Sequence, residues 1–552
     1  MSDNHVAVSA TGLLADFNRA GALTWADVHP AQQLSYLFGE KDARVHLALA
    51  LTVRALRSGS ICLELDRIRN LDLGEDEVPI PDEWWPETDG WLGALRASPA
   101  VTVGDGPGGD RPLRLVDGAL YLERHFADQE SVRRALLARL ASAPSSGEPE
   151  GQDAAVDLAL TSPVTVIAGG PGVGKTYTIR RIIDRLRAEH PDALVALAAP
   201  TGKAAARMTE SLGDGSLKAT TLHALLGKRP GSMTRFRHRA DNPLPHDVVV
   251  IDEMSMVSMV LMSRLLDALK PTARLVLVGD PDQLSSVDAG SVLADITRAP
   301  AASGIVARLV RNYRFTGAIQ ELATAVRRGD ADAALAVLQG SDASVRLAPV
   351  GAGAELLRER VVGAGGRVYG AAASGRVDEA LAALDAHRLL CGHRRGPFGV
   401  SHWTRQVQAW LVDGVPGYSV DGEFHVGRPV MVTANRPEFG LYNGDTGVVL
   451  VEDDRPQAWF VAGGEVKSFS PFLLDGLTSV HAMTVHKAQG SQFDDVSVVL
   501  PPPGSPLLTR ELLYTAVSRA RSSVLLLGDA EAVAEAVQNP ARRMSRLAQR
   551  LR

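Results

Sequence analysis

The sequence predicts an α/β fold in which parallel sheets carry helices on both faces, next to an α-rich N-terminal domain. Beyond residue 160, short apolar runs alternate with helical patterns. A complete phosphate-binding loop follows the first of these runs and opens a helix. A polar stretch rich in Pro, Gly and Ser, at about 143–152, separates this region from the first 145 residues. These three observations together predict parallel-sheet domains built around a nucleotide-binding loop.

The expected strands are short runs of Val, Leu, Ile and Ala. They lie at 165–169, 194–200, 248–252, 274–280, 388–392, 494–500 and 523–529. Apolar runs of this length, separated by helices, are typical of parallel strands that are buried on both faces. Residues 416–475 are richer in Gly and turn signals and predict a small all-β insert. In the N-terminal part, 112–126 predicts a hairpin that turns at Asp117 and Gly118.

Bulk properties predict a soluble, intracellular protein. The 552 residues suggest about three or four domains. No run of 18 apolar residues occurs, and the N-terminus has no basic start followed by an apolar segment, so we expect neither a membrane span nor a signal peptide. The two cysteines, Cys62 and Cys391, are too far apart in sequence for a metal motif and fit a reducing compartment. We therefore expect a cytoplasmic location.

Charge is distributed unevenly along the chain. The net charge is −6, but residues 1–150 hold 23 acidic and 14 basic side chains, whereas the other 402 residues hold 41 acidic and 44 basic. A polyanion would be repelled by the first part and tolerated by the second. The sequence therefore predicts that nucleic acid, if bound, contacts the region after residue 150.

The phosphate-binding loop is the most specific motif in the chain. Residues 169–176, GGPGVGKT, match GxxxxGK[ST] in full and lie between an apolar strand and an amphipathic helix. Backbone N–H groups of such a loop bind phosphate oxygens, and the helix N-terminus adds positive potential. Lys175 would hold the β- and γ-phosphates, and Thr176 would bind Mg²⁺. The nucleotide-binding set is Gly170, Pro171, Gly172, Val173, Gly174, Lys175, Thr176 and Tyr177.

Two further polar positions follow the strands of the same region. Asp252 and Glu253 come directly after the strand VVVI, at the edge of an open α/β sheet where ligands bind. Asp252 would hold Mg²⁺ and Glu253 would orient and deprotonate the attacking water. Gln283 follows the next strand, where it would sense the γ-phosphate; alternatively it is a surface residue after a turn. These residues predict an NTPase.

The order of motifs between Thr165 and Asp529 resembles that of superfamily 1 helicases of the RecD type. The matching segments are GGPGVGKT (169–176), APTGKAAARM (199–208), TLHALLG (221–227), VVVIDEMSM (248–256), LVGDPDQLSSVDAG (277–290), LVRNYRF (309–315), MTVHKAQGSQFDDV (483–496) and LLYTAVSRAR (512–521). The later motifs are weak one by one and specific as a set. The resemblance covers about two thirds of the chain.

The resemblance implies two RecA-like lobes with ATP between them. The first lobe would span 152–300, with a small excursion at about 212–245, and the second 301–415 plus 476–552. The insert at 416–475 would be SH3-like, and residues 1–145 would form a domain that docks on a partner. The first lobe would supply the phosphate-binding loop, and the second Arg314 and Arg519 as arginine fingers. Gln152 would read the adenine, although a linker glutamine explains it equally well.

The resemblance also implies contacts with DNA along the tops of both lobes. The expected residues are Pro200, Thr201, Lys203, Thr221 and His223 on the first lobe, and Thr484, His486 and Lys487 on the second. Such polar groups would grip phosphates without reading sequence. His223 is alternatively a partly buried, satisfied histidine. A basic segment with Lys228, Arg229, Arg235, Arg237 and Arg239 would face DNA or form a solvated loop.

The implied activity is ATP-dependent 5′→3′ translocation on single-stranded DNA, as the motor subunit of a heterotrimer with RecB- and RecC-like chains. The N-terminal part is short and acidic and carries Trp84, Trp85 and Trp91, which suit a protein interface or close the domain's own core. We expect no nuclease site in this chain. The alternatives are a stand-alone helicase of this type, an NTP-driven module that binds nucleic acid without unwinding it, and an RNA helicase.

Overall fold

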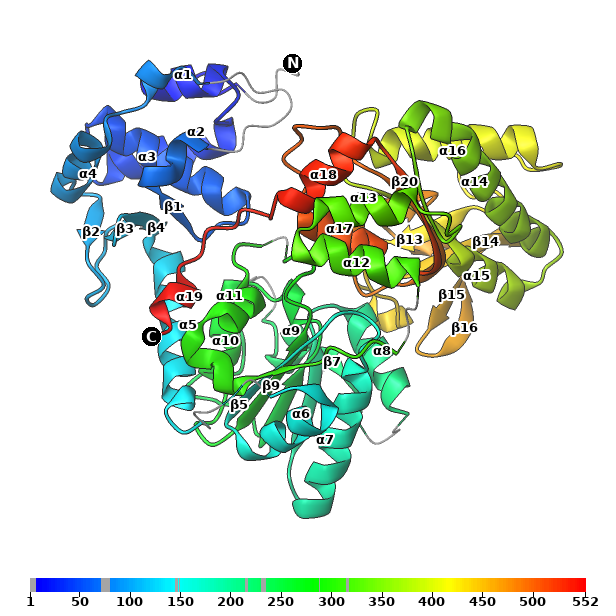
Figure 1. The fold of residues 1–552 in the computed structure, drawn as a ribbon, viewed down its shortest axis with the longest axis horizontal. Helices are drawn as coiled ribbons and strands as arrows, with labels where there is room; N and C mark the ends of the chain where they lie inside the picture. Colours follow the sequence, from blue (N-terminus) through cyan, green and yellow to red (C-terminus); the bar gives the residue numbers. More distant parts are fainter. Residues whose placement is uncertain are drawn as a thin grey trace.

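The computed structural model describes residues 6–70, 80–143, 147, 149–213, 217–229, 235–286, 288–313 and 317–552. Figure 1 shows an N-terminal domain in blue beside two α/β lobes. The first lobe is drawn in cyan to green, and the second in green through yellow to red. The lobes are built on separate parallel sheets, as the sequence predicts.

The N-terminal domain joins four helices to a four-stranded sheet. Its helices are α1 (Leu13–Arg19), α2 (Trp25–Leu37), α3 (Ala43–Arg57) and α4 (Thr88–Ala97). Its strands are β1 (Cys62–Glu64), β2 (Val101–Val103), β3 (Leu113–Val116) and β4 (Ala119–Leu122), in the order β1-β4-β3-β2. The hairpin β3–β4 is confirmed, and Asp117 (φ 50°) and Gly118 (φ 77°) form its turn. It is shorter than expected because α5 (Glu123–Leu140) begins directly after β4.

Trp84, Trp85 and Trp91 belong to the core of this domain, so the interface interpretation is wrong for these three. Trp85 and Trp91 are 7% and 1% exposed, and Trp84 packs against the same cluster. The Trp91 indole N–H donates to the Arg44 carbonyl at 2.7 Å. Phe17 and Trp85 meet edge to face, with ring centroids 4.8 Å apart. A small domain needs such large side chains to bury enough apolar area.

The first lobe contains a six-stranded sheet in which every pairing is parallel. The strands are β5 (Val164–Ala168), β6 (Val195–Ala199), β7 (Thr220–Thr221), β8 (Val248–Ile251), β9 (Arg274–Gly279) and β10 (Val306–Arg308), in the order β10-β5-β9-β8-β6-β7. The helices are α6 (Gly151–Thr161), α7 (Lys175–Glu189), α8 (Gly202–Leu212), α9 (Leu222–Leu225), α10 (Met259–Ala268) and α11 (Val292–Arg298). The sheet extends past the expected boundary at residue 300, because the three-residue β10 is too short to be recognised as a strand from its pattern.

The second lobe contains a five-stranded sheet, also fully parallel. Its strands are β11 (Val345–Ala348), β12 (His387–Cys391), β18 (Ala482–Thr484), β19 (Phe493–Val499) and β20 (Ala520–Leu527), in the order β11-β20-β19-β12-β18. Its helices are α12 (Ala318–Arg328), α13 (Ala331–Gln339), α14 (Val350–Ala373), α15 (Val377–Ala386), α16 (Val400–Gly414), α17 (Arg510–Val517) and α18 (Ala530–Gln538). All the expected apolar runs of both lobes are strands.

The insert is an antiparallel sheet between two strands of the second lobe. Its strands are β13 (Pro429–Val432), β14 (Thr446–Glu452), β15 (Arg455–Ala462), β16 (Glu465–Phe469) and β17 (Leu477–Ser479), in the order β16-β15-β14-β13-β17. The sheet ends later than the expected 475, because β17 returns to pair with β13. The all-β character that the turn-rich sequence predicts is present.

The last residues of the chain, 539–552, form a C-terminal strap. After α18 the strap leaves the second lobe and passes to the N-terminal domain and α5, where α19 (Leu547–Arg550) lies (Figure 1). The Ile61 N–H donates to the Met544 carbonyl at 2.7 Å. Leu547 is fully buried in the core that the first lobe shares with α5. The strap therefore joins the C-terminal end of the chain to the N-terminal domain and to the first lobe.

Replacing Trp91 by alanine should destabilise the N-terminal domain. Losing a fully buried indole and its hydrogen bond costs about 3–5 kcal/mol. We expect a clear fall in the first thermal unfolding transition, followed by tryptophan fluorescence. Trp25→Ala is the matched control, because Trp25 is 52% exposed. Equal, small effects of both substitutions would contradict the core assignment.

Candidate active site between the two lobes

The phosphate-binding loop connects β5 to α7. Gly172 (φ 83°) and Gly174 (φ 84°) adopt left-handed backbone conformations, which glycine tolerates without strain. The Lys175 ammonium donates to the carbonyls of Gly169 and Gly170, at 2.8 and 2.9 Å. The lysine therefore lies folded over its own loop, at the N-terminus of α7, where phosphate groups are favoured.

A cavity of about 710 Å³ lies between the loop and the second lobe. This volume lies within the range of small-molecule sites, about 300–1,000 Å³. The expected site residues that line it are Pro171, Gly172, Gly174, Lys175, Thr176, Tyr177, Asp252, Glu253, Gln283 and Arg519. Gly170 and Val173 lie behind this surface: a Cβ on Gly170 would meet the Tyr514 hydroxyl at 2.8 Å, and Val173 is buried in the core.

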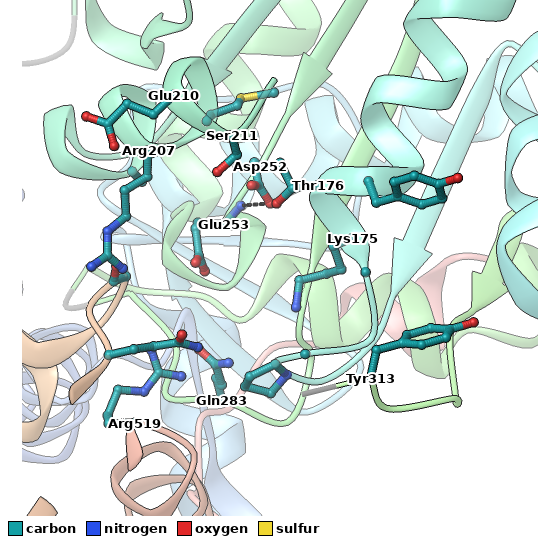
Figure 2. A pocket seen from close by; sticks show the side chains of 18 of the residues that line it. Lys175, Thr176, Arg207, Glu210, Ser211, Asp252, Glu253, Gln283, Tyr313 and Arg519 are labelled. Atoms are coloured by element: carbon teal, nitrogen blue, oxygen red, sulfur yellow. Dashed lines mark hydrogen bonds between the residues drawn. The ribbon is translucent and has the colours of Figure 1, made fainter. Parts of the chain in front are cut away.

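Asp252 and Glu253 follow β8 at the floor of the cavity (Figure 2). The Glu253 N–H donates to the Asp252 carboxylate at 2.8 Å. Burial, and then the neighbouring Glu253 carboxylate, raise the pKa of Asp252 to about 6, while Lys175 acts in the opposite direction. Glu253 has φ 53°, a left-handed conformation that costs a non-glycine residue energy and is often found at functional sites.

Gln283 lies at the seam of the two lobes and contacts a buried carboxylate. Its side-chain amide donates to Asp280 at 3.0 Å, and the Tyr514 hydroxyl, on α17 of the second lobe, donates to the same oxygen at 3.0 Å. Gln283 is 4% exposed, so it is not the surface residue that the alternative interpretation describes. The Leu284 N–H donates to the Thr515 hydroxyl at 2.9 Å, so the residue after Gln283 also joins the first lobe to the second.

Arg519 enters the cavity from the second lobe and is 3% exposed. Its guanidinium donates to the Thr515 carbonyl and the Ser518 hydroxyl, both at 3.0 Å. Burial lowers the pKa of Arg519, and the carboxylates of Glu253 and Asp280 act in the opposite direction. In Figure 2, Arg519 and Gln283 lie together, across the pocket from Thr176 and Asp252.

Arg207 is a site residue that sequence reasoning missed. It lies on α8, lines the cavity, and donates across the seam to the Gly490 carbonyl of the second lobe. Burial lowers the pKa of Arg207, whereas Asp385 and Glu253 raise it. Its only sequence signal was its position in APTGKAAARM, since one arginine on a helix carries no information about the partner lobe.

Aromatic and amide side chains surround the outer end of the cavity. The Gln152 amide donates to the Val173 carbonyl at 3.3 Å, so Gln152 lies against the phosphate-binding loop rather than in a free linker. Tyr177 and Tyr313 line the cavity and are 58% and 59% exposed. The Tyr313 N–H donates to the Gly172 carbonyl at 3.0 Å. Arg314 lies outside the described residues.

The three threonines expected at DNA share one local geometry. Each follows or ends a strand, and its hydroxyl accepts a hydrogen bond from the N–H three residues later. The pairs are Thr201 with Ala204 (3.2 Å), Thr221 with Ala224 (3.1 Å) and Thr484 with Lys487 (3.4 Å). These are helix N-caps, which serve the fold whether or not DNA is bound.

The other expected DNA contacts differ in exposure. Lys487 is exposed, whereas Pro200, His223 and His486 are partly buried. Lys203 donates to the Gly444 carbonyl of the insert at 3.3 Å, and burial lowers its pKa to about 8. All five residues of the basic segment are exposed. The segment folds back on itself, with the Arg237 N–H donating to the Gly227 carbonyl at 2.9 Å.

Family models match three parts of the chain. They are the AAA domain at residues 152–289, the UvrD-like helicase C-terminal domain at 479–527, and the domain described as RecBCD enzyme subunit RecD, N-terminal domain, at 19–121. The first match covers the phosphate-binding loop and Gln283. The second covers Arg519, and the third covers the domain with the buried tryptophans.

Curated relatives match nearly the whole chain. The RecBCD enzyme subunit RecD of Mycolicibacterium smegmatis is 46% identical over 559 residues, which cover 96% of this chain and 97% of the relative. The chain belongs to the RecD family. The RecBCD enzyme subunit RecD of Mycobacterium tuberculosis is 43% identical and covers 100% of this chain and 99% of the relative. The ATP-dependent RecD2 DNA helicase of Deinococcus radiodurans is 32% identical and covers 81% of this chain and 62% of the relative.

This RecD-family chain is therefore an ATP-dependent helicase, and its phosphate-binding loop faces the cavity between the lobes. Within the described residues, no three or more His, Cys, Asp or Glu side chains are grouped so that they could hold a metal ion. A search of the same residues finds no helix with the length and apolar character that crossing a membrane requires.

Replacing Arg519 by alanine should leave nucleotide binding in place and reduce kcat by about 10³-fold or more, as loss of an arginine finger does. The reason is that Lys175 and the loop would bind the phosphates from the first lobe, whereas Arg519 would act on the charge that develops during hydrolysis. Binding is measured with a fluorescent nucleotide and turnover by phosphate release. Normal turnover in this variant would contradict the assignment.

Replacing Arg207 by alanine should weaken closure of the seam. The Gly490 carbonyl loses a charged donor, which costs about 1–3 kcal/mol, and kcat/KM for ATP should fall about 5- to 100-fold. Arg180→Ala is the matched control: Arg180 is an exposed arginine of the same lobe and pairs with Asp184 on α7. If the two variants behave alike, Arg207 has no role at the seam.

Proposed function

We propose that this chain moves 5′→3′ along single-stranded DNA as the motor subunit of a RecBCD-type helicase and nuclease that acts at double-strand breaks. One observation carries the proposal: a single cavity has Lys175 from the first lobe on one side and Arg519 from the second on the other. A triphosphate held between them would bridge the lobes. Its hydrolysis removes charge from the bridge, so that the lobes can open, and repeated closure and opening moves the chain along a strand.

Each residue of the cavity has a separate task in this proposal. Lys175 binds the β- and γ-phosphates, and Glu253 orients the attacking water and accepts its proton. Gln283 contacts the γ-phosphate from the seam. Arg519, with Arg314, stabilises the negative charge of the transition state. Gln152 reads the adenine, close to the two exposed tyrosines that flank the loop.

Thr176 and Asp252 form a donor set that fits Mg²⁺. One hydroxyl and one carboxylate line the cavity together, and Mg²⁺ prefers oxygen ligands completed by phosphate oxygens and water. The raised pKa of Asp252 indicates that its charge lacks compensation, which a cation would supply. When bound, Mg²⁺ would neutralise charge between the β- and γ-phosphates.

The parts of the chain are assigned as follows. Residues 152–308, which include β10, form the first lobe with its excursion at 212–245, and 309–415 plus 480–552 form the second. The insert at 416–475, extended to β17, is the SH3-like element. The strand crosses the tops of both lobes, past the three capping threonines and their neighbouring basic side chains.

Residues 1–145 dock on a RecB- or RecC-like chain in the cytoplasm. The printed name of the relatives, RecBCD enzyme subunit RecD, supports such a partner. The buried tryptophans do not serve this role. The exposed apolar side chains of α2, namely Trp25, Tyr36 and Leu37, with exposures of 52, 87 and 69%, offer a surface that a partner would cover.

A stand-alone helicase is less well supported than a subunit. The alignment covers 62% of the RecD2 helicase but 97% and 99% of the RecBCD subunits. The identity is also higher to the RecBCD subunits, at 46 and 43%, than to the RecD2 helicase, at 32%. An RNA helicase, or an NTP-driven module that binds nucleic acid without unwinding it, would have the same nucleotide cavity. The following experiment distinguishes these two alternatives from a DNA motor.

Single-stranded DNA should stimulate ATP hydrolysis by the reconstituted complex, and RNA of the same sequence should not. The Lys175→Ala variant is the control, since it should fold normally and show no turnover with either polymer. Displacement of streptavidin from oligonucleotides that carry biotin at one end then measures polarity, with faster displacement expected at the 3′ end. Stimulation by RNA alone would favour the RNA helicase, and the absence of stimulation by either polymer would exclude a motor.

A further inference from the structure

A second cavity, of about 400 Å³, lies between the N-terminal domain, the C-terminal strap and the two lobes. We refer to it as the inter-domain cleft. Its walls come from α3 and the segment after β1, from the strap, and from the seam beyond Gln283. Leu284 forms part of its lining, whereas Gln283 lines the nucleotide cavity. The two cavities therefore lie on either side of the seam, and neighbouring residues of one segment line them.

Every formally charged side chain in the lining of the inter-domain cleft is an arginine. They are Arg54 and Arg67 of the N-terminal domain, and Arg542 and Arg543 of the strap. No Asp or Glu occurs among the lining residues. This contrasts with residues 1–150, where acidic side chains outnumber basic ones by nine. Arg67 pairs at 3.5 Å with Glu64, which does not line the cleft, and the Arg543 guanidinium donates to the Ser286 carbonyl. Even with these contacts, the lining itself is cationic where the acidic domain faces the motor.

The remaining lining is largely apolar. It includes Leu51, Leu63 and Ile68 of the N-terminal domain and Leu507 and Leu512 of the second lobe. An apolar floor with guanidinium groups around it suits a polymer with flat bases and a charged backbone, because bases pack on apolar surface and guanidinium groups bind phosphates bidentately. A small anion has no apolar part that could pack on these leucine and isoleucine side chains, so the lining favours the polymer.

The cleft is continuous with the expected path of DNA. His486, in the segment of the second lobe that is expected to contact phosphates, lines the cleft, as does Ser285 directly after the seam. The seam itself is joined across the lobes, because the Gln489 amide donates to the Leu284 carbonyl at 2.6 Å. A strand that leaves His486 would therefore enter the cleft.

We propose that the inter-domain cleft binds the backbone of the single strand, so that the N-terminal domain and the strap form a third wall of the DNA path. The proposal rests on the proposed function, since it assigns a further contact to the same strand. It gives the N-terminal domain a role in binding nucleic acid in addition to docking. It also explains why the strap returns from the second lobe to the N-terminal domain.

The test removes one arginine from each wall, in the full chain. Arg67 and Arg542 are exposed, so the double variant Arg67→Ala/Arg542→Ala should retain its thermal stability. Affinity for labelled dT₂₀ is measured by fluorescence anisotropy across a salt series. Each lost phosphate contact lowers the slope of log K against log salt by about 0.7 for single strands, so the slope should become shallower by about 1.4.

Two controls accompany the double variant. Arg96→Ala removes an exposed arginine of the same domain that does not line the cleft, and should leave the slope unchanged. Arg67→Lys/Arg542→Lys keeps the charges and should restore most of the slope. Photo-crosslinking of 4-thiothymidine-substituted strands to the unaltered chain should yield adducts in residues 51–68 or 539–544.

An unchanged slope in the double alanine variant, or no adducts in these two segments, would overturn the proposal. Loss of partner binding without any change in DNA affinity would instead identify the cleft as a protein-binding site and would also overturn it. Failure of the proposed function is distinguishable, because it appears in the unaltered chain as ATP hydrolysis that single-stranded DNA does not stimulate.

Discussion

The arrangement of the two lobes depends on the hydrogen bonds that the buried carboxylate of Asp280 accepts. It accepts hydrogen bonds from the Asp282 N–H at 3.1 Å, from Gln283 and from Tyr514. Burial raises the pKa of Asp280, and Lys175 and these donors oppose the shift. Because a buried charge is expensive unless it is fully hydrogen-bonded, opening the seam would remove one donor and expose the group to water. The closed seam is thus favoured by the hydrogen bonds that this carboxylate accepts from both lobes.

The same seam is connected to the N-terminal domain. The Gly290 N–H donates to the Gly59 carbonyl at 3.0 Å, and Arg543 of the strap donates to the Ser286 carbonyl. The N-terminal domain, the C-terminal strap and the segment of the first lobe after Gln283 therefore meet at residues 286–290. A movement of Gln283 would therefore shift residues that are hydrogen-bonded to the N-terminal domain, the domain that we propose docks on a partner.

Sequence reasoning succeeded where the determinants are local. The phosphate-binding loop, the strands of both lobes and the hairpin at Asp117 follow from runs of a few residues, because apolar periodicity and turn chemistry act over that distance. It failed where the determinant is a distant partner. Arg207 is informative only because Gly490 lies opposite, and β10 is a strand only because β5 is beside it. The sequence also could not decide whether Trp84, Trp85 and Trp91 face a partner or their own core, because composition does not show which face of a domain is covered.

Lys203 shows which contact within the chain must break before this side chain can bind a DNA strand. In this structure its ammonium donates to Gly444 of the insert, and Tyr442 packs so closely that a Cβ on Gly202 would lie 2.1 Å from the ring. Only glycine fits there, so α8 and the insert are closely apposed. If Lys203 is to bind a phosphate, the loop around Gly444 must withdraw, and burial has already lowered the pKa of the lysine to about 8. A phosphate would favour the charged form that burial disfavours, so a bound strand and the carbonyl of the insert compete for the same ammonium.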